Sequence, residues 1–219
     1  MRKELDEKLG LLNREMILMG SICEKNIADV FKALEKGDRD LAFSVYKEDY
    51  DIGAKARDIE RLCLSLILRE QPVAGDLRLV SAVLKMISDL KRIGIQCCDI
   101  AEIVMKFDFS YKGADVALLP GMALEAQKIL RKAVDSFVNM DFEAAREVFR
   151  MDEAVDGYFS MVRESIVSEA KHGPGADIKI ALDVLMIAKY LERIGDHACN
   201  IAKWVLYIGG ETEAKGEPA

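Results

Sequence analysis

Pairs of acidic residues four positions apart are the side chains in this sequence that are best suited to chemistry. Glu192 and Asp196 lie in the stretch YLERIGDHACNIA, and Asp152 and Asp156 lie in the stretch DEAVD. Residues at i and i+4 share one face of an α-helix, so each pair would present two carboxylates side by side. Like charges at this spacing repel one another, and two such pairs that face each other need either a cation between them or wide exposure to water.

The four carboxylates therefore predict a metal site, and a solvated acidic face is the alternative. Oxygen ligands suit hard cations such as Mg²⁺, Mn²⁺ or iron, and Zn²⁺ is a further candidate. Asn200 continues the row of Glu192 and Asp196 along the helix, whereas His197 lies about 100° around the helix from Asp196. We expect His197 and Asn200 to support such a site from beside the metal ligands.

The same motif occurs about one hundred residues earlier without its acids. The stretch DLKRIGIQCCDIA aligns with YLERIGDHACNIA, and the alignment extends without gaps from residues 76–102 to residues 177–203. Gly94 and Gly195 recur at the same repeat position, although each costs about 1 kcal/mol relative to alanine in a helix interior. This recurrence indicates close helix packing at both positions, with a hinge as the alternative.

The earlier repeat departs from the acidic pattern at most positions. Lys91 stands in the place of Glu192, and Ile95 stands in the place of Asp196. Asp49 retains the position of Asp152. Our hypothesis is that the first repeat has lost its metal and that Lys91 serves there as an internal cation toward Asp49 or Asp51. The alternative is that Lys91 points into water.

The rest of the sequence predicts the helices that must position these acids. Apolar residues recur at helical spacing along almost the whole chain, which contains only 4 prolines. Turn signals interrupt this pattern near 35–40, 70–76, 108–115, 138–144 and 171–177. The segments between them predict helices over 4–36, 38–69, 76–108, 115–139, 141–170 and 177–208. The expected N-caps are Asp38, Asp76, Asp141 and Asp177.

Long helices joined by short turns favour an antiparallel arrangement. Together with the internal duplication, this predicts an all-α fold of two tandem three-helix bundles made of six long antiparallel helices. We expect the first repeat over 1–108, the second over 115–208 and a flexible tail over 209–219.

Composition excludes several classes of function. The net charge is −7 and no basic stripe occurs, which argues against nucleic acid and against unaided binding to an anionic membrane. No apolar run approaches the roughly 18 residues that a membrane span needs, and the first residues lack the apolar core of a signal peptide. The 5 cysteines include no C-x-x-C pair, which is typical of reduced thiols in a cytoplasmic protein.

The repeated motifs of this sequence resemble those of a known family. A duplicated three-helix unit with QPVAGDLRLV, LKRIG and LERIGDHACNIA is similar to the PhoU family of phosphate-specific transport system accessory proteins. The resemblance implies metal binding at the acidic motifs and no enzymatic activity. It also implies a cytoplasmic regulator that negatively controls phosphate metabolism through contacts with the ATPase subunit of a phosphate ABC transporter and with a sensor histidine kinase. Contact with a membrane would then occur only through these partners.

Two repeats with similar faces suit a homodimer or the simultaneous binding of two partners. The competing functions are a metal-dependent, carboxylate-bridged enzyme and a metal buffer. Helical di-iron enzymes use a Glu-x-x-His motif on each of two helices. Glu169 precedes His172 at this spacing, but no glutamate precedes His197 by three residues, so the sequence offers one such motif and not two. The regulatory function is therefore the one that we expect.

Overall fold

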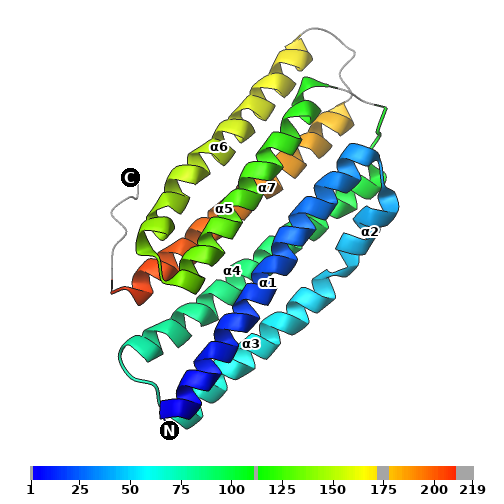
Figure 1. Cartoon of the computed structure of the whole chain (residues 1–219). Helices are drawn as coiled ribbons and strands as arrows, with labels where there is room; N and C mark the ends of the chain where they lie inside the picture. Colours follow the sequence, from blue (N-terminus) through cyan, green and yellow to red (C-terminus); the bar gives the residue numbers. More distant parts are fainter. Residues whose placement is uncertain (1, 111–112, 172–177, 211–219) are drawn as a thin grey trace.

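All the regular secondary structure in the described part of the chain is helical. In the computed structural model, residues 2–110, 113–171 and 178–210 are described, without the side chains of residues 2, 49, 50 and 114. Within these ranges the chain forms seven helices and no strand (Figure 1). The helices are α1 (Arg2–Lys36), α2 (Arg39–Lys47), α3 (Asp49–Glu70), α4 (Gly75–Lys106), α5 (Ala114–Asn139), α6 (Phe142–Lys171) and α7 (Ile178–Ile208). The predicted all-α fold is confirmed.

The helix predicted over 38–69 is present as two consecutive helices, α2 and α3, which meet at Glu48. The backbone N–H of Glu48 donates to the carbonyl of Val45 at 3.0 Å, which is a tighter turn than the α-helical i to i−4 bond. The chain then resumes regular helix, because the N–H of Ile52 donates to the carbonyl of Glu48 at 3.0 Å. This local tightening accounts for the interruption.

Side-chain caps start two of the helices as predicted. Asp38 accepts a hydrogen bond from the N–H of Leu41 at 2.9 Å, and Asp141 accepts one from the N–H of Ala144 at 2.9 Å. The cap expected at Asp76 is wrong, because α4 begins one residue earlier, at Gly75. The expected cap Asp177 and the predicted tail from residue 211 onward lie outside the described residues.

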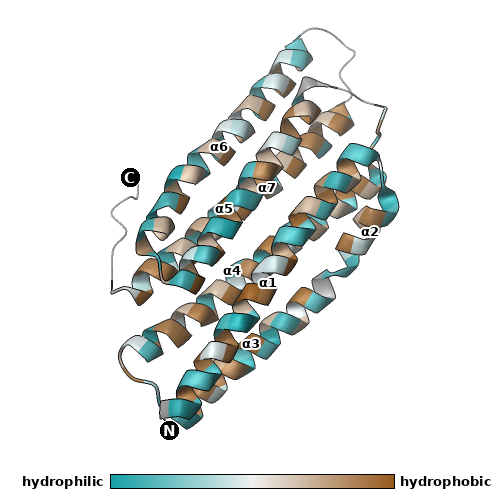
Figure 2. Cartoon of the chain, in the orientation of Figure 1, coloured by the Kyte–Doolittle hydropathy of each residue, from teal (hydrophilic) through white to brown (hydrophobic). Residues whose placement is uncertain are grey.

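The helices pack into two adjoining groups that share one core. α1 packs against α2, α3 and α4, and α5, α6 and α7 all pack against one another. The two groups meet where α4 lies against α7 and α1 lies against α5. The buried side chains form one continuous apolar cluster that runs through both groups. Figure 2 shows the basis of this packing, since hydrophobic and hydrophilic residues alternate around each long helix.

The glycine of the first repeat allows a close contact between α3 and α4. A Cβ atom at Gly94 would lie 2.4 Å from Cδ1 of Ile52, which is too short for any real contact. The sequence prediction of close helix packing at this position is therefore confirmed. Among the helices in the described ranges, none is both long and apolar enough to cross a membrane.

Candidate functional site

The packing of α6 against α7 brings the four predicted acids to one site. Asp152 and Asp156 lie on α6, and Glu192 and Asp196 lie on α7. The charges of Asp156, Glu192 and Asp196 all act on Asp152, so these three carboxylates lie within electrostatic range of it. We call these four residues the acidic cluster.

Asp152 is the innermost member of the acidic cluster. Its Oδ1 atom is buried and has no hydrogen-bond partner. A Cβ atom at Gly195 would lie 2.4 Å from this same oxygen. The glycine therefore leaves the space that the carboxylate occupies, which confirms the close packing predicted for Gly195.

Burial raises the pKa of Asp152 to about 6. The negative charges of Asp156, Asp196 and Glu192 add to this effect, because each of them disfavours a further negative charge nearby. A contact with the thiol of Cys199 acts in the opposite direction. A carboxyl group with this pKa changes its charge near neutral pH.

Asp156 lies one helical turn further along α6 and is more exposed than Asp152. Partial burial raises its pKa, and the charges of Glu192 and Asp196 raise it further. The positive charge of Lys189 partly offsets this rise. The two acids of α6 are thus both held in an environment that resists their ionisation.

Lys189 is a basic residue of the site that the sequence prediction missed. Its ammonium group forms an ion pair with Glu192, and it lies 5.4 Å from the centroid of the Phe159 ring on α6. The side chain of Glu192 is only 17% exposed, so this pair is partly shielded from water. The i, i+3 spacing of Lys189 and Glu192 was a signal in the sequence that could have identified the pair.

The acidic cluster fits a cation in its chemistry, although it is not a ready-made coordination sphere. Within the described ranges, no group of three or more His, Cys, Asp or Glu side chains is close enough together to hold a metal ion as it stands. Even so, the buried Oδ1 of Asp152, which has no hydrogen-bond partner, and the oxygen ligands that four carboxylates offer suit a cation between the two helices. Ligation by these four residues stays a prediction.

His197 and Asn200 face the other repeat in the structure. Nδ1 of His197 lies 2.9 Å from Oδ1 of Asp89 on α4, and the Asn200 amide donates to the same oxygen at 3.3 Å. Asp89 is a second residue that the sequence prediction missed. The alignment of the repeats conceals it, because its counterpart in the second repeat is Tyr190. A supporting role of His197 and Asn200 beside a metal stays a prediction.

The predicted pairing in the first repeat is also untested. Lys91 is exposed, whereas the side chain of Asp49 lies outside the described residues. Ile95 is partly buried, as an apolar residue in the place of a carboxylate would be. His172, the other histidine of the chain, lies outside the described residues as well.

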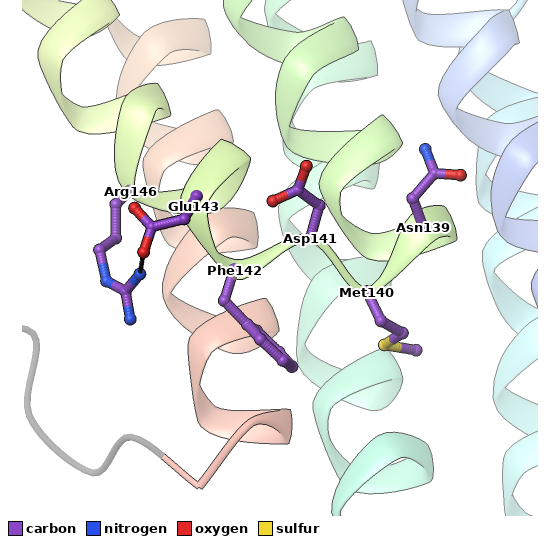
Figure 3. A pocket seen from close by; sticks show the side chains of 6 residues that line it. All are labelled: Asn139, Met140, Asp141, Phe142, Glu143 and Arg146. Atoms are coloured by element: carbon purple, nitrogen blue, oxygen red, sulfur yellow. Dashed lines mark hydrogen bonds and ion pairs between the residues drawn. The ribbon is translucent and has the colours of Figure 1, made fainter.

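An open pocket lies at the turn between α5 and α6 (Figure 3). Its lining residues are Asn139, Met140, Asp141, Phe142, Glu143 and Arg146. Asp141 caps α6, and Glu143 forms an ion pair with Arg146, so the acidic groups there already have partners. The pocket contains none of the four predicted acids.

Comparisons with known proteins match both repeats. The PhoU domain family matches the chain twice, over residues 16–104 and 119–205. The phosphate-specific transport system accessory protein PhoU homolog of Clostridium acetobutylicum is 31% identical over 211 residues, which are 94% of this chain and 94% of that protein. The homolog of a Burkholderia species is 31% identical over 217 residues, which are 97% of this chain and 91% of that protein.

A solved structure gives the same result. The crystal structure of PhoU from Pseudomonas aeruginosa superposes with a TM-score of 0.88 at 30% identity, over 94% of this chain and 99% of that one. The matched segments contain the acidic motifs of α6 and α7 as well as the equivalent helices of the first repeat. The resemblance inferred from the sequence is thereby confirmed, and the chain belongs to the PhoU family.

Proposed function

We propose that this protein is a non-enzymatic regulator of phosphate uptake and of the phosphate-starvation response. It acts in the cytoplasm through contacts with the ATPase subunit of a phosphate ABC transporter and with a sensor histidine kinase. The observation that carries this proposal is the double PhoU-domain match, together with relatives that are named phosphate-specific transport system accessory proteins.

The surface of the molecule supports recognition of proteins in preference to nucleic acid. The net charge of −7 would repel a phosphate backbone. Two repeats of similar structure offer two similar helical faces, which suit either a homodimer or two different partners.

We further propose that the acidic cluster holds a divalent or trivalent cation such as iron, Mn²⁺, Mg²⁺ or Zn²⁺. Asp152, Asp156, Glu192 and Asp196 would hold it, and the cation would supply positive charge between α6 and α7. This positive charge would offset the burial and the repulsion between carboxylates that together raise the pKa values of Asp152 and Asp156. The second repeat would then be stiffened when the cation is present.

The regulatory proposal is tested by deletion of the gene from the host cell. Expression of a phosphate-starvation reporter should become independent of phosphate, and the wild-type gene should restore the response. The protein should also co-purify with the transporter ATPase or the kinase, and light scattering should give twice the chain mass of 24.4 kDa. A reporter that still follows phosphate in the deletion strain would refute the regulatory function.

The cation is tested by elemental analysis of the purified protein and of two matched variants. Asp156→Asn removes one carboxylate of the acidic cluster, whereas Glu153→Gln removes an exposed carboxylate three residues away on α6. We expect metal in the wild type and in Glu153→Gln, and much less in Asp156→Asn. Equal metal content in all three proteins would place the metal elsewhere.

A further inference from the structure

The ammonium group of Lys189 is paired with one of the four acids that we propose as metal ligands. Lys189 forms an ion pair with Oε2 of Glu192 on its own helix. It also contacts the ring of Phe159 on α6, with 5.4 Å between the ammonium nitrogen and the ring centroid. These two contacts place the positive charge between the helices that carry the four acids.

The charge of Lys189 extends to the second helix of the site. Its contact with Phe159 brings it against α6, three residues along that helix from Asp156. Lys189 therefore pairs directly with one carboxylate of α7 and lies against the helix that carries Asp152 and Asp156.

Two other basic residues of α7, Arg193 and Lys203, do not take this place. Arg193 follows Glu192 directly in the sequence, yet it is exposed and its charge acts on Tyr190. Lys203 is exposed as well, and its charge acts on Cys199. Adjacent residues point about 100° apart around a helix, which explains why Arg193 does not pair with its neighbour.

We propose that Lys189 is a tethered cation that competes with the metal for the acidic cluster. A metal that binds Glu192 must displace the ammonium group, because one carboxylate cannot pair fully with the ammonium group and coordinate the metal at the same time. The side chain of Lys189 is 43% exposed and has a flexible four-carbon stem, so it can move into water when it is displaced. Lys189 thereby sets the metal concentration at which the cluster becomes occupied.

This inference rests on the proposed cation site, and it predicts an affinity that can be measured directly. We would titrate Mn²⁺ into the metal-stripped full chain and follow free Mn²⁺ by electron paramagnetic resonance. Lys189→Gln should bind Mn²⁺ about three- to tenfold more tightly than the wild type, since it removes a partly shielded ion pair and a nearby positive charge. Lys189→Arg, which keeps the charge, should stay near the wild-type affinity.

Arg193→Gln is the matched control, because it removes the same charge from the same helix only four residues away. Its Mn²⁺ affinity should change by less than about twofold, since exposed charges are strongly screened. An equal change in Lys189→Gln and Arg193→Gln would mean that only net charge matters, which would overturn the proposal. Weaker binding by Lys189→Gln would also overturn it, because Lys189 would then help to build the metal site.

Thermal unfolding supplies a readout that separates this inference from the proposed function. In the presence of a chelator, Lys189→Gln should unfold at a lower temperature than Arg193→Gln. Addition of Mn²⁺ should raise the unfolding temperature of Lys189→Gln above that of the wild type. If only Lys189→Gln binds Mn²⁺, the result supports competition between Lys189 and the metal. It also refutes the proposal that the acidic cluster of the wild type holds a cation. If no protein binds Mn²⁺ or is stabilised by it, both the cation site and the competition are refuted.

Discussion

The carboxylate of Asp152 on α6 lies against the backbone of Gly195 on α7, with no room for a methyl group between them. This contact places a titratable oxygen in a buried position without a hydrogen-bond partner. Such an arrangement lowers the stability of the folded chain when the carboxylate is charged. Residues that lower stability in this way are common at functional sites. The contact between Asp152 and Gly195 is therefore tested first by substitution.

Asp152→Asn should stabilise the metal-free protein above neutral pH. The pKa of Asp152 is about 6 in the folded chain, above the ordinary value of 3.8 that applies when the chain is unfolded. Between these values the folded state retains a proton that the unfolded state has lost, so stability falls as the pH rises through about 6. At pH 7.5 the substitution should increase the free energy of unfolding by about 2 kcal/mol, allowing for partial exposure.

Urea denaturation at a series of pH values in the presence of a chelator measures this effect. The difference between Asp152→Asn and the wild type should be small near pH 4 and should grow up to about pH 7. Glu153→Gln, in which the neighbouring and exposed acid is changed, is the control and should show no such trend. A difference that is independent of pH would mean that Asp152 ionises normally.

Gly195→Ala should destabilise the protein even though alanine favours helix. The new Cβ atom would lie 2.4 Å from Oδ1 of Asp152, so α6 and α7 must separate or the carboxylate must move. Overpacking of this kind lowers the free energy of unfolding by about 1–3 kcal/mol. Gly157→Ala is the control within α6, because nothing lies within 4 Å of its Cβ position, and it should stabilise by up to about 1 kcal/mol.

The identity of the clashing group can be tested by a second substitution. In an Asp152→Ala background the oxygen is absent, and the next atom, Cγ1 of Val155, would be at an ordinary distance of 3.6 Å. Gly195→Ala should then be neutral or stabilising, as measured by urea denaturation. Persistent destabilisation in this background would show that a group other than Asp152 requires the glycine.

Sequence patterns were sufficient to predict the structural features that repeat at fixed intervals along the chain. Helical periodicity and turn residues predicted the helices, because one apolar face per helix must be buried. The duplicated glycines predicted two close contacts, which the structure places at Ile52 in the first repeat and at Asp152 in the second. The grouping of the acids on α6 and α7 followed from their spacing and from the expected packing of neighbouring helices.

Features that depend on the rotation of one helix against another could not be predicted in the same way. The partner of His197 is Asp89, more than one hundred residues away, and its position depends on how α4 packs against α7. The interruption at Glu48 arises from one tightened hydrogen bond and carries no glycine or proline as a signal. The depth of Asp152 likewise depends on side-chain packing that periodicity does not encode.

His197 and Asp89 should contribute to stability as a coupled pair across the two repeats. Nδ1 of His197 lies 2.9 Å from Oδ1 of Asp89, and both side chains are largely buried. Each single substitution by alanine leaves the other group without this partner, so the double mutant should lose less than the sum of both losses. The coupling energy should be about 1 kcal/mol in a double-mutant cycle that is measured by urea denaturation.

The corresponding cycle of His197 with Asp196 tests the alternative that this histidine belongs to the acidic cluster. Adjacent residues do not face one another on a helix, so these two substitutions should be additive within about 0.5 kcal/mol. If the coupling were found with Asp196 and not with Asp89, the histidine would act at the acidic cluster instead of between the repeats.

The 5 cysteines should be unreactive in the folded protein. All are free and buried, and burial raises the pKa of Cys23 and of Cys63 to about 12. The pKa of Cys199 is raised too, by burial and by the adjacent carboxylate of Asp152. Because the thiolate is the reactive form, an aromatic disulfide reagent at pH 8 should label the native chain only at the rate at which the structure opens.

Labelling in denaturant provides the reference, since all 5 thiols should then react at once. Mn²⁺ should slow the labelling of Cys199 more than that of Cys63, because Cys199 contacts the acidic cluster whereas Cys63 lies on α3 in the first repeat. Mass spectrometry of the labelled peptides separates the two sites. A Cys199 that reacts within seconds in the native protein would contradict its burial beside Asp152, because a buried thiol with a raised pKa has almost no thiolate to react.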